Sequence, residues 1–286
     1  MQNESIRSVI RYFSYFSYPP SFEELYAFYP QKISRNSLKQ IVNDLVEKGV
    51  LIEQVVSTNN EAKYTLPQYG IFFKKAVKRR RISAKKRKTI TRFISFSHYT
   101  PSIQFVGISG SVSMNNADVN DDIDLFIITK SGELWTGRAL SLALAFILGK
   151  RRSRGVIVAK DRVCLNLFFD RAHLSIPKEK QTLYIAHEIL QVKPILNKNG
   201  TYEQFLHENR WIQKYFPNVI VPRMHTRNHY QPSIISTFVE SCCRSIQWHI
   251  MKHHITKERI SEGQLWFYPR DFEQQLNWKM NRKDIV

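Results

Sequence analysis

The chain has 286 residues, of which 43% are hydrophobic and 23% charged, and it carries a formal net charge of +19 at pH 7. This balance is typical of a folded protein with two or three small cores and excludes a disordered chain. The positive charge favours a polyanionic partner such as nucleic acid. Three cysteines without a Cys-x-x-Cys motif do not make a disulfide framework, and the longest apolar run, 139–148, is too short to cross a bilayer. We therefore expect a cytoplasmic protein with no membrane partner.

Residues 1–70 combine three helical segments with a hairpin pattern. Apolar residues recur at helical spacing in the first segment, and the second opens on a capping motif at Ser21. The third segment runs from Ser34 to Gly49, a glycine placed as a C-cap. Two short apolar runs that flank a polar turn then predict a β-hairpin within 50–66.

This order of elements resembles a winged-helix domain. In that family the third helix, here about 35–48, usually enters the major groove of DNA. The resemblance implies nucleic-acid contacts from Arg35 and Lys39, since cationic side chains bind phosphates and base edges. Acidic residues share the same helix, and winged helices also dock proteins, so both kinds of partner stay open.

Residues 71–100 begin with a strongly basic run. Ten of the 43 basic residues of the chain lie between Lys74 and Lys88, in a pattern of apolar residues that allows a helix. Such a helix is either a solvated linker or a strip that binds phosphates. The density of cations favours the strip, because each neutralised phosphate adds salt-dependent affinity. The expected nucleic-acid-binding residues are Lys78, Arg79, Arg80, Arg81, Lys85 and Lys86.

Residues 101–195 contain the most informative motif of the chain. An apolar strand leads into Gly110 and Ser111, and after a polar connection a second apolar strand opens on Asp122 and Asp124. Because strand residues alternate faces at about 3.3 Å per residue, the two carboxylates share a face about 7 Å apart at Cα. Paired carboxylates bind hard cations such as Mg²⁺ or Mn²⁺, and a glycine turn lets backbone N–H groups approach phosphate.

Glycine, serine, both aspartates and the flanking strands together resemble the signature of the nucleotidyltransferase superfamily, which includes DNA polymerase beta and the poly(A) and CCA-adding enzymes. The resemblance implies a mixed β-sheet domain that uses an NTP and a divalent cation. It also implies that Asp122 and Asp124 hold the metal while Gly110 and Ser111 seat the triphosphate. Two cations that follow the aspartate strand are further candidates for phosphate contact, with solvent exposure as the alternative: Lys130 and Arg138. A hairpin edge kept soluble by its aspartates would leave the Gly-Ser turn unexplained.

Enzymes of this superfamily usually use a third acid on a neighbouring strand. The matching strand here is 163–170, and Asn166 falls where that acid is expected. An amide is a weaker ligand for Mg²⁺ than a carboxylate and cannot act as a base. Asp161 and Asp170 could substitute, and under regular alternation Asp170 shares a face with Cys164 and Asn166. The expected catalytic set is Asp122, Asp124 and Asn166.

The sequence thus predicts an α+β protein with an N-terminal winged-helix domain (1–70), a basic helical linker (71–100), a nucleotidyltransferase-type mixed β-sheet domain (101–195) and a helical C-terminal region (196–286). The expected function is Mg²⁺-dependent transfer of a nucleoside monophosphate from an NTP to a hydroxyl acceptor on RNA or protein. Because Asn166 replaces the third acid, a DNA-binding regulator with a degenerate, nucleotide-sensing domain is the alternative. An adaptor that only binds nucleic acid is a third reading.

Overall fold

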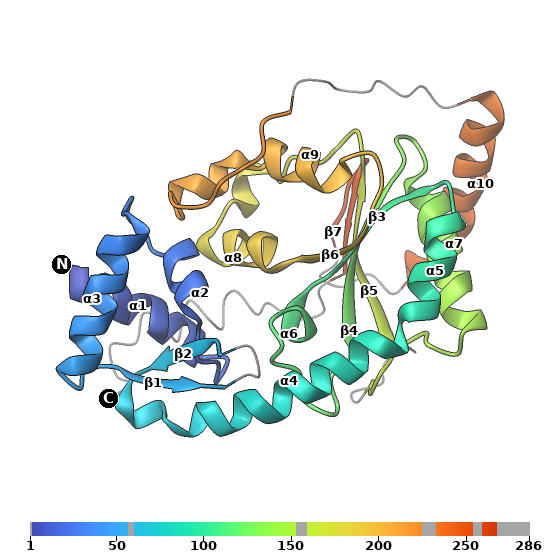
Figure 1. Cartoon of the computed structure of the whole chain (residues 1–286). Coiled ribbons are helices and arrows are strands. Elements are labelled where there is room, and N and C mark those ends of the chain that lie inside the picture. Colours follow the sequence, from blue (N-terminus) through green and yellow to red (C-terminus); the bar gives the residue numbers. More distant parts are fainter. Residues whose placement is uncertain (1, 57–59, 153–158, 225–232, 254–258, 268–286) are drawn as a thin grey trace.

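The computed structural model describes residues 2–56, 60–152, 159–224, 233–253 and 259–267. It is an α+β protein built on a mixed six-stranded sheet with helices on both faces (Figure 1). None of the helices in this described part has the length and apolarity of a membrane span.

The N-terminal elements are three helices followed by a two-stranded antiparallel sheet: α1 (Gln2–Ser14), α2 (Phe22–Ala27), α3 (Arg35–Glu47), β1 (Ile52–Val55) and β2 (Ala62–Thr65). The Ser21 side chain accepts a hydrogen bond from the Glu24 N–H, and the Glu24 carboxylate accepts one from the Ser21 N–H. This capping box starts α2, and Ser34 caps α3 by accepting from the Ser37 N–H. The order of helices and strands follows the sequence-based prediction.

The segment predicted as a linker forms two helices, α4 (Ile71–Thr89) and α5 (Thr91–Tyr99), which follow the short 3-10 helix η1 (Pro67–Tyr69). Figure 1 shows α4 running from the N-terminal elements along the lower edge of the molecule, past α6, to α5. One side of α4 is buried, so the helix is packed along its length instead of crossing solvent.

The six-stranded sheet has the order β6-β3-β4-β5-β8-β7, in which β4 and β5 are parallel and the other pairs antiparallel. Its strands are β3 (Ile103–Ile108), β4 (Ile123–Thr129), β5 (Val163–Asp170), β6 (Lys193–Asn197), β7 (Arg259–Ile260) and β8 (Gln264–Trp266). The prediction of a helical region over 196–286 is therefore incomplete, because β7 and β8 extend the sheet from within it. These strands have two and three residues, too few to show a strand period in the sequence.

Helices connect and cover the sheet: α6 (Gly110–Ser113), α7 (Leu134–Ile147), α8 (Leu183–Gln191), α9 (Thr201–Glu208) and α10 (Ile234–Met251), with the 3-10 helices η2 (Lys178–Lys180) and η3 (Arg210–Lys214). Figure 1 shows α8 and α9 on one face and α5, α7 and α10 on the other. Separate clusters of buried side chains fill the two faces. The strand predicted at 156–158 lies outside the described residues.

The N-terminal helices pack against α8 and share its core. The His187 ring of α8 stacks on Tyr12 of α1 at 3.6 Å between centroids and on Phe28 at 4.4 Å. The Asn218 side chain accepts a hydrogen bond from the Ile33 N–H at 3.0 Å and donates to nearby backbone carbonyls. The N-terminal unit is thus attached to the sheet face whose core includes Phe126, the same face that carries Asp124.

Candidate metal and nucleotide site

The predicted glycine turn lies directly against one of the predicted metal ligands. β3 ends at Ile108, and the Ser109 N–H donates to the Asp124 carbonyl at 3.0 Å, which joins the turn to β4. Gly110 has φ +63°, and a Cβ at this position would lie 2.7 Å from Asp124 Oδ2. Any side chain at Gly110 would displace the carboxylate, so the close approach of backbone and carboxylate requires glycine.

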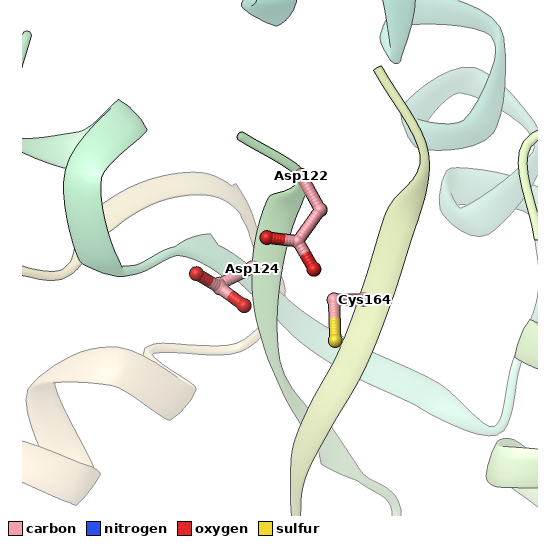
Figure 2. A group of neighbouring side chains, drawn as sticks. All are labelled: Asp122, Asp124 and Cys164. Carbon is pink, nitrogen blue, oxygen red and sulfur yellow. The ribbon is translucent and has the colours of Figure 1, made fainter. Parts of the chain in front are cut away.

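Asp122, Asp124 and Cys164 gather at the start of the parallel pair β4 and β5 (Figure 2). One carboxylate oxygen of each aspartate and the Cys164 sulfur lie within 4.8 Å of one another. All three side chains are partly accessible. The register pairs Asp124 directly with Cys164, so the residue opposite Asp124 on the neighbouring strand is the cysteine and not Asn166.

Asn166 still contacts the site, because it lies at a β-bulge. The register between β4 and β5 shifts from Leu125–Leu165 to Phe126–Leu167, which leaves Asn166 as an extra residue. Its amide Nδ2 donates to Asp124 Oδ1, and its Oδ1 accepts from the Cys164 thiol. Both ends of the amide are therefore used to orient neighbouring groups.

The bulge also overturns the prediction that alternation continues to the end of this strand. Beyond it Phe168 is buried on the sheet face opposite Asp124. Asp170 lies at the far end of β5, where its carboxylate accepts from the Gly132 and Ala172 N–H groups at 2.7 Å each. Asp161 pairs with a lysine instead. Neither acid substitutes for a third carboxylate.

The site carries negative charge that its own cations do not fully balance. Burial and the neighbouring Asp122 raise the pKa of Asp124 to about 7. Burial and Asp124 likewise raise the pKa of Glu188, on α8, to about 7. Burial and the two aspartates raise the pKa of the Cys164 thiol. A cation placed among these groups would relieve the repulsion, which is the electrostatic setting of a metal site.

Sequence reasoning missed two residues of this site. Arg152, in the segment before β5, donates to the Asp122 carboxylate and lies 3.5 Å from the Cys164 sulfur. Glu188 lines a small cavity together with Ser109. Arg152 had no signal beyond being one of many cations. Glu188 could have been noticed as an acid on a mostly apolar helix.

Ser111 lies on α6 next to the site. Its hydroxyl donates to Asp121 Oδ2 at 2.8 Å, and the same oxygen accepts from the Asp118 N–H at 2.9 Å. No side chain caps the N-terminus of α6. The hydroxyl therefore orders the connecting loop, while the backbone N–H groups of the turn have no cap.

Lys130 and Arg138 do not come to the carboxylates, contrary to prediction. Lys130 follows the opposite end of β4, about 20 Å along the strand from Asp124, and its Nζ lies 3.5 Å from Glu133. Arg138 donates to the Gln247 side chain of α10 and lies over the Phe267 ring. Proximity in sequence misled here, because a strand of this length carries the chain away from the site.

Lys86, predicted to bind nucleic acid, is instead a buried lysine with 1% of its surface exposed. Its Nζ donates to the carbonyls of Val119 and Asp121 at 3.0 and 2.6 Å. The same group donates to the Asp161 carboxylate at 3.0 Å. Three oxygens compensate the buried charge, so Lys86 holds the loop that leads into Asp122.

Two more cations of the run face the same loop. Arg79 donates to the Phe16 carbonyl and to the Asn116 side chain, each at 3.2 Å, which corrects its predicted exposure to nucleic acid. Arg87 donates to the Asn115 side chain at 2.8 Å. We call Arg79, Lys86 and Arg87 the inner face of α4.

Most of the other cations of α4 are exposed. All of the exposed ones except Lys75 are spaced three or four residues apart along the helix. We call these five cations the outer face: Lys74, Lys78, Arg81, Lys85 and Lys88. Arg80 is half-buried. On α3, Lys39 is exposed, as is Arg35, which pairs with Glu23 and lies 4.9 Å from the centre of the Tyr26 ring.

Comparison of this chain with known proteins leaves the site to be interpreted from its own geometry: no family model matches it, no curated protein matches it, and no solved structure matches it.

Proposed function

We propose that this chain is a metal-dependent nucleotidyltransferase that moves a nucleoside monophosphate from an NTP to a hydroxyl group. The observation that carries this proposal is the contact between the Gly110 turn and the Asp124 carboxylate, with Asp122 on the same strand. It brings a backbone suited to phosphate next to a pair of metal ligands. The resemblance of the motif to the nucleotidyltransferase superfamily agrees with this arrangement.

The residues at the site suit a divalent cation. The carboxylates of Asp122 and Asp124 converge, and the pKa of Asp124 is raised by burial and by repulsion from Asp122, which a cation would offset. A divalent cation such as Mg²⁺ or Mn²⁺ bound there would neutralise the phosphates and the charge that develops during transfer. Asp122 and Asp124 would hold it, and Asn166 would keep the Asp124 carboxylate oriented.

The chain's own groups would position the triphosphate and the acceptor. The Gly110 turn and the start of α6, which includes Ser111, would donate backbone N–H groups to phosphate oxygens. In the transfer, the acceptor oxygen bonds to the α-phosphorus as the bond to the bridging oxygen breaks. Pyrophosphate leaves with that electron pair, and the hydroxyl proton passes to solvent.

We propose nucleic acid as the acceptor, on the basis of the outer face of α4. Its cations span 15 residues, from Lys74 to Lys88, or about 21 Å along the helix axis. Successive cations are about 4.5–6 Å apart along the axis, a spacing that suits a row of phosphates. The N-terminal unit, which we interpret as a winged helix, carries two further exposed cations on α3, Arg35 and Lys39. A protein acceptor is less well supported, because it would not need a continuous row of cations.

A nucleotide-sensing regulator is the second candidate, favoured by one specific observation. Asn166 falls on β5 where the resembled enzymes usually carry a third acid, and Cys164 is the residue opposite Asp124. Without that acid, a bound nucleotide could be held without being transferred. The winged-helix interpretation of the N-terminal unit suits this alternative equally well.

One experiment separates the two candidates. The full chain is incubated with NTPs labelled at the α-phosphate, Mg²⁺ or Mn²⁺, and total RNA or protein. We expect label to appear on RNA and to be lost in Asp122→Asn and Asp124→Asn, with Asp118→Asn as a matched control in the nearby loop. Cation-dependent NTP binding without any transfer would reject the enzyme in favour of the sensor.

A further inference from the structure

The third potential ligand at the site is a thiol. Cys164 projects from β5 beside Asp124, and its sulfur lies within 4.8 Å of a carboxylate oxygen from each of Asp122 and Asp124 (Figure 2). A tetrahedral cation with bonds of about 2.0–2.3 Å has its ligand atoms about 3.5 Å apart. Bringing the three ligand atoms from within 4.8 Å to about 3.5 Å of one another requires side-chain movements of about 1 Å.

The neighbouring amide does not compete for this position. Asn166 donates to Asp124 through Nδ2 and accepts from the Cys164 thiol through Oδ1, so it contacts both prospective ligands. In metal sites, residues that hydrogen-bond to the ligands typically orient them without binding the metal themselves. The arrangement thus favours Cys164, and not Asn166, as the third residue that bonds to the cation.

A cationic group already occupies part of this space. The Arg152 guanidinium pairs with Asp122 and lies 3.5 Å from the Cys164 sulfur, so it contacts two of the three ligands. A bound cation would take over the pairing with Asp122 and displace the guanidinium from the ligand atoms. Carboxylates and sulfur are therefore gathered at a place that accommodates positive charge in this conformation.

A thiol changes which cation the site prefers. Oxygen ligands suit Mg²⁺, whereas thiolate ligands favour softer cations such as Zn²⁺, Co²⁺ and Cd²⁺. We propose that Cys164 is the third protein ligand of this site and makes it select a thiophilic divalent cation over Mg²⁺. As the sulfur–metal bond forms, the thiol proton passes to solvent. The inference rests on the proposed function only for the location of the cation.

The test measures cation binding without any nucleotide. The metal-free full chain is titrated with Co²⁺, and the sulfur-to-cobalt charge-transfer absorption is recorded. We expect this band in the wild type and in the Cys242→Ser, Cys243→Ser double variant, which lacks the other two thiols of the chain. We expect its loss in Cys164→Ser, together with weakening of Co²⁺ and Zn²⁺ binding by roughly tenfold or more.

A second variant keeps the test informative if loss of the thiol perturbs the fold. Cys164→Asp supplies an oxygen ligand at the same place, and we expect it to bind Mg²⁺ or Mn²⁺ more tightly than the wild type does. Far-UV circular dichroism and thermal unfolding check that both variants are folded. An absent band, a band that needs Cys242 or Cys243, or equal affinity for Mg²⁺ and Co²⁺ would overturn the inference.

The outcomes for the inference and for the proposed function can be told apart. Mg²⁺-supported nucleotide transfer with no cobalt–sulfur band would leave the enzyme and reject the thiol ligand. A Cys164-dependent band with no transfer under any of these cations would support the ligand and reject the enzyme.

Discussion

The inner and outer faces of α4 have the same residue types but different surroundings. On the inner face, Lys86 is buried and bonded to the loop between α6 and β4. On the outer face, Lys85, its immediate neighbour, is exposed. A run of cations that looks uniform in the sequence is thus divided by helical periodicity into a structural half and an accessible half. The comparison teaches that charge density alone does not identify a binding surface, because burial decides which cations remain available.

The largest expected effect is the loss of Lys86. Lys86→Met would leave the Asp161 carboxylate and two loop carbonyls without their donor, so we expect the free energy of unfolding to fall by about 3–5 kcal/mol. Lys85→Met is the matched control and should change it by less than about 0.5 kcal/mol. Urea unfolding measures both. Equal losses in the two variants would erase the distinction between the faces.

The next largest effect concerns the Gly110 turn, which leads through α6 into the loop that the inner face contacts. Gly110→Ala adds a Cβ 2.7 Å from Asp124 Oδ2 at a positive φ, so we expect a stability loss of about 1–3 kcal/mol and weaker cation binding. Gly149→Ala is the matched control, since Gly149 also has φ +63° but has nothing within 4 Å of an added Cβ. Chemical denaturation and cation titration separate backbone strain, common to both variants, from the contact with Asp124. Cation affinity that falls equally in both would contradict this account of the turn.

A smaller stability effect but a clear binding effect is expected on the outer face. The triple variant Lys78→Ala, Arg81→Ala, Lys85→Ala should keep the stability of the wild type within about 1 kcal/mol and weaken binding to single-stranded RNA. If each cation neutralises one phosphate, the slope of log affinity against log salt should become shallower by about 2. Fluorescence anisotropy at several salt concentrations measures this slope.

A charge-matched triple variant distinguishes a defined surface from general electrostatic attraction. Lys178, Lys214 and Arg244 are exposed on other elements, and replacing them by alanine removes the same net charge. We expect little change in the salt slope from this second variant. If both triple variants lower affinity and slope equally, the outer face of α4 is not a specific phosphate-binding strip.

The pH dependence of stability extends the comparison to carboxylates. Asp161 is paired with Lys86, whereas Asp124 lies beside another carboxylate and has its pKa raised to about 7. The folded protein therefore binds a proton that the unfolded chain releases near pH 4, so stability of the metal-free protein should fall as pH rises from about 4 to about 7. We expect this fall to be smaller in Asp124→Asn but not abolished, because Glu188, whose pKa is raised mainly by burial, still contributes to it. An unchanged pH profile in that variant, measured by urea unfolding with a chelator present, would contradict this assignment.

Much of the local structure could be predicted from the sequence. The α+β class, the N-terminal helices and hairpin, and the strands around the Gly110 and Asp122 motif follow from periodicity and capping patterns, and the structure contains them. Asp122 and Asp124 come together because they are two residues apart on one strand, a relation that alternation specifies. Gly110 lies beside them because β3 and β4 are adjacent antiparallel strands, so the end of β3 meets the start of β4.

Other parts of the site depend on register and could not be predicted. The register of β4 and β5 pairs Cys164 with Asp124, and a one-residue bulge at Asn166 then sends the later residues of β5 to other faces. Arg152 and Glu188 come from segments distant in sequence, and nothing local specifies which cation or acid arrives. Lys130 was misplaced because nearness along the chain was taken for nearness in space.

The sequence by itself determined which groups could do chemistry here: a glycine turn, two aspartates on one strand face and a dense run of cations. Only the tertiary structure decided how those groups are used. It buried Lys86, brought Arg152 to Asp122 and gathered the Cys164 thiol with the two aspartates. The physical reason is range: periodicity and capping act over a few residues, whereas strand register, burial and charge compensation depend on partners far along the chain.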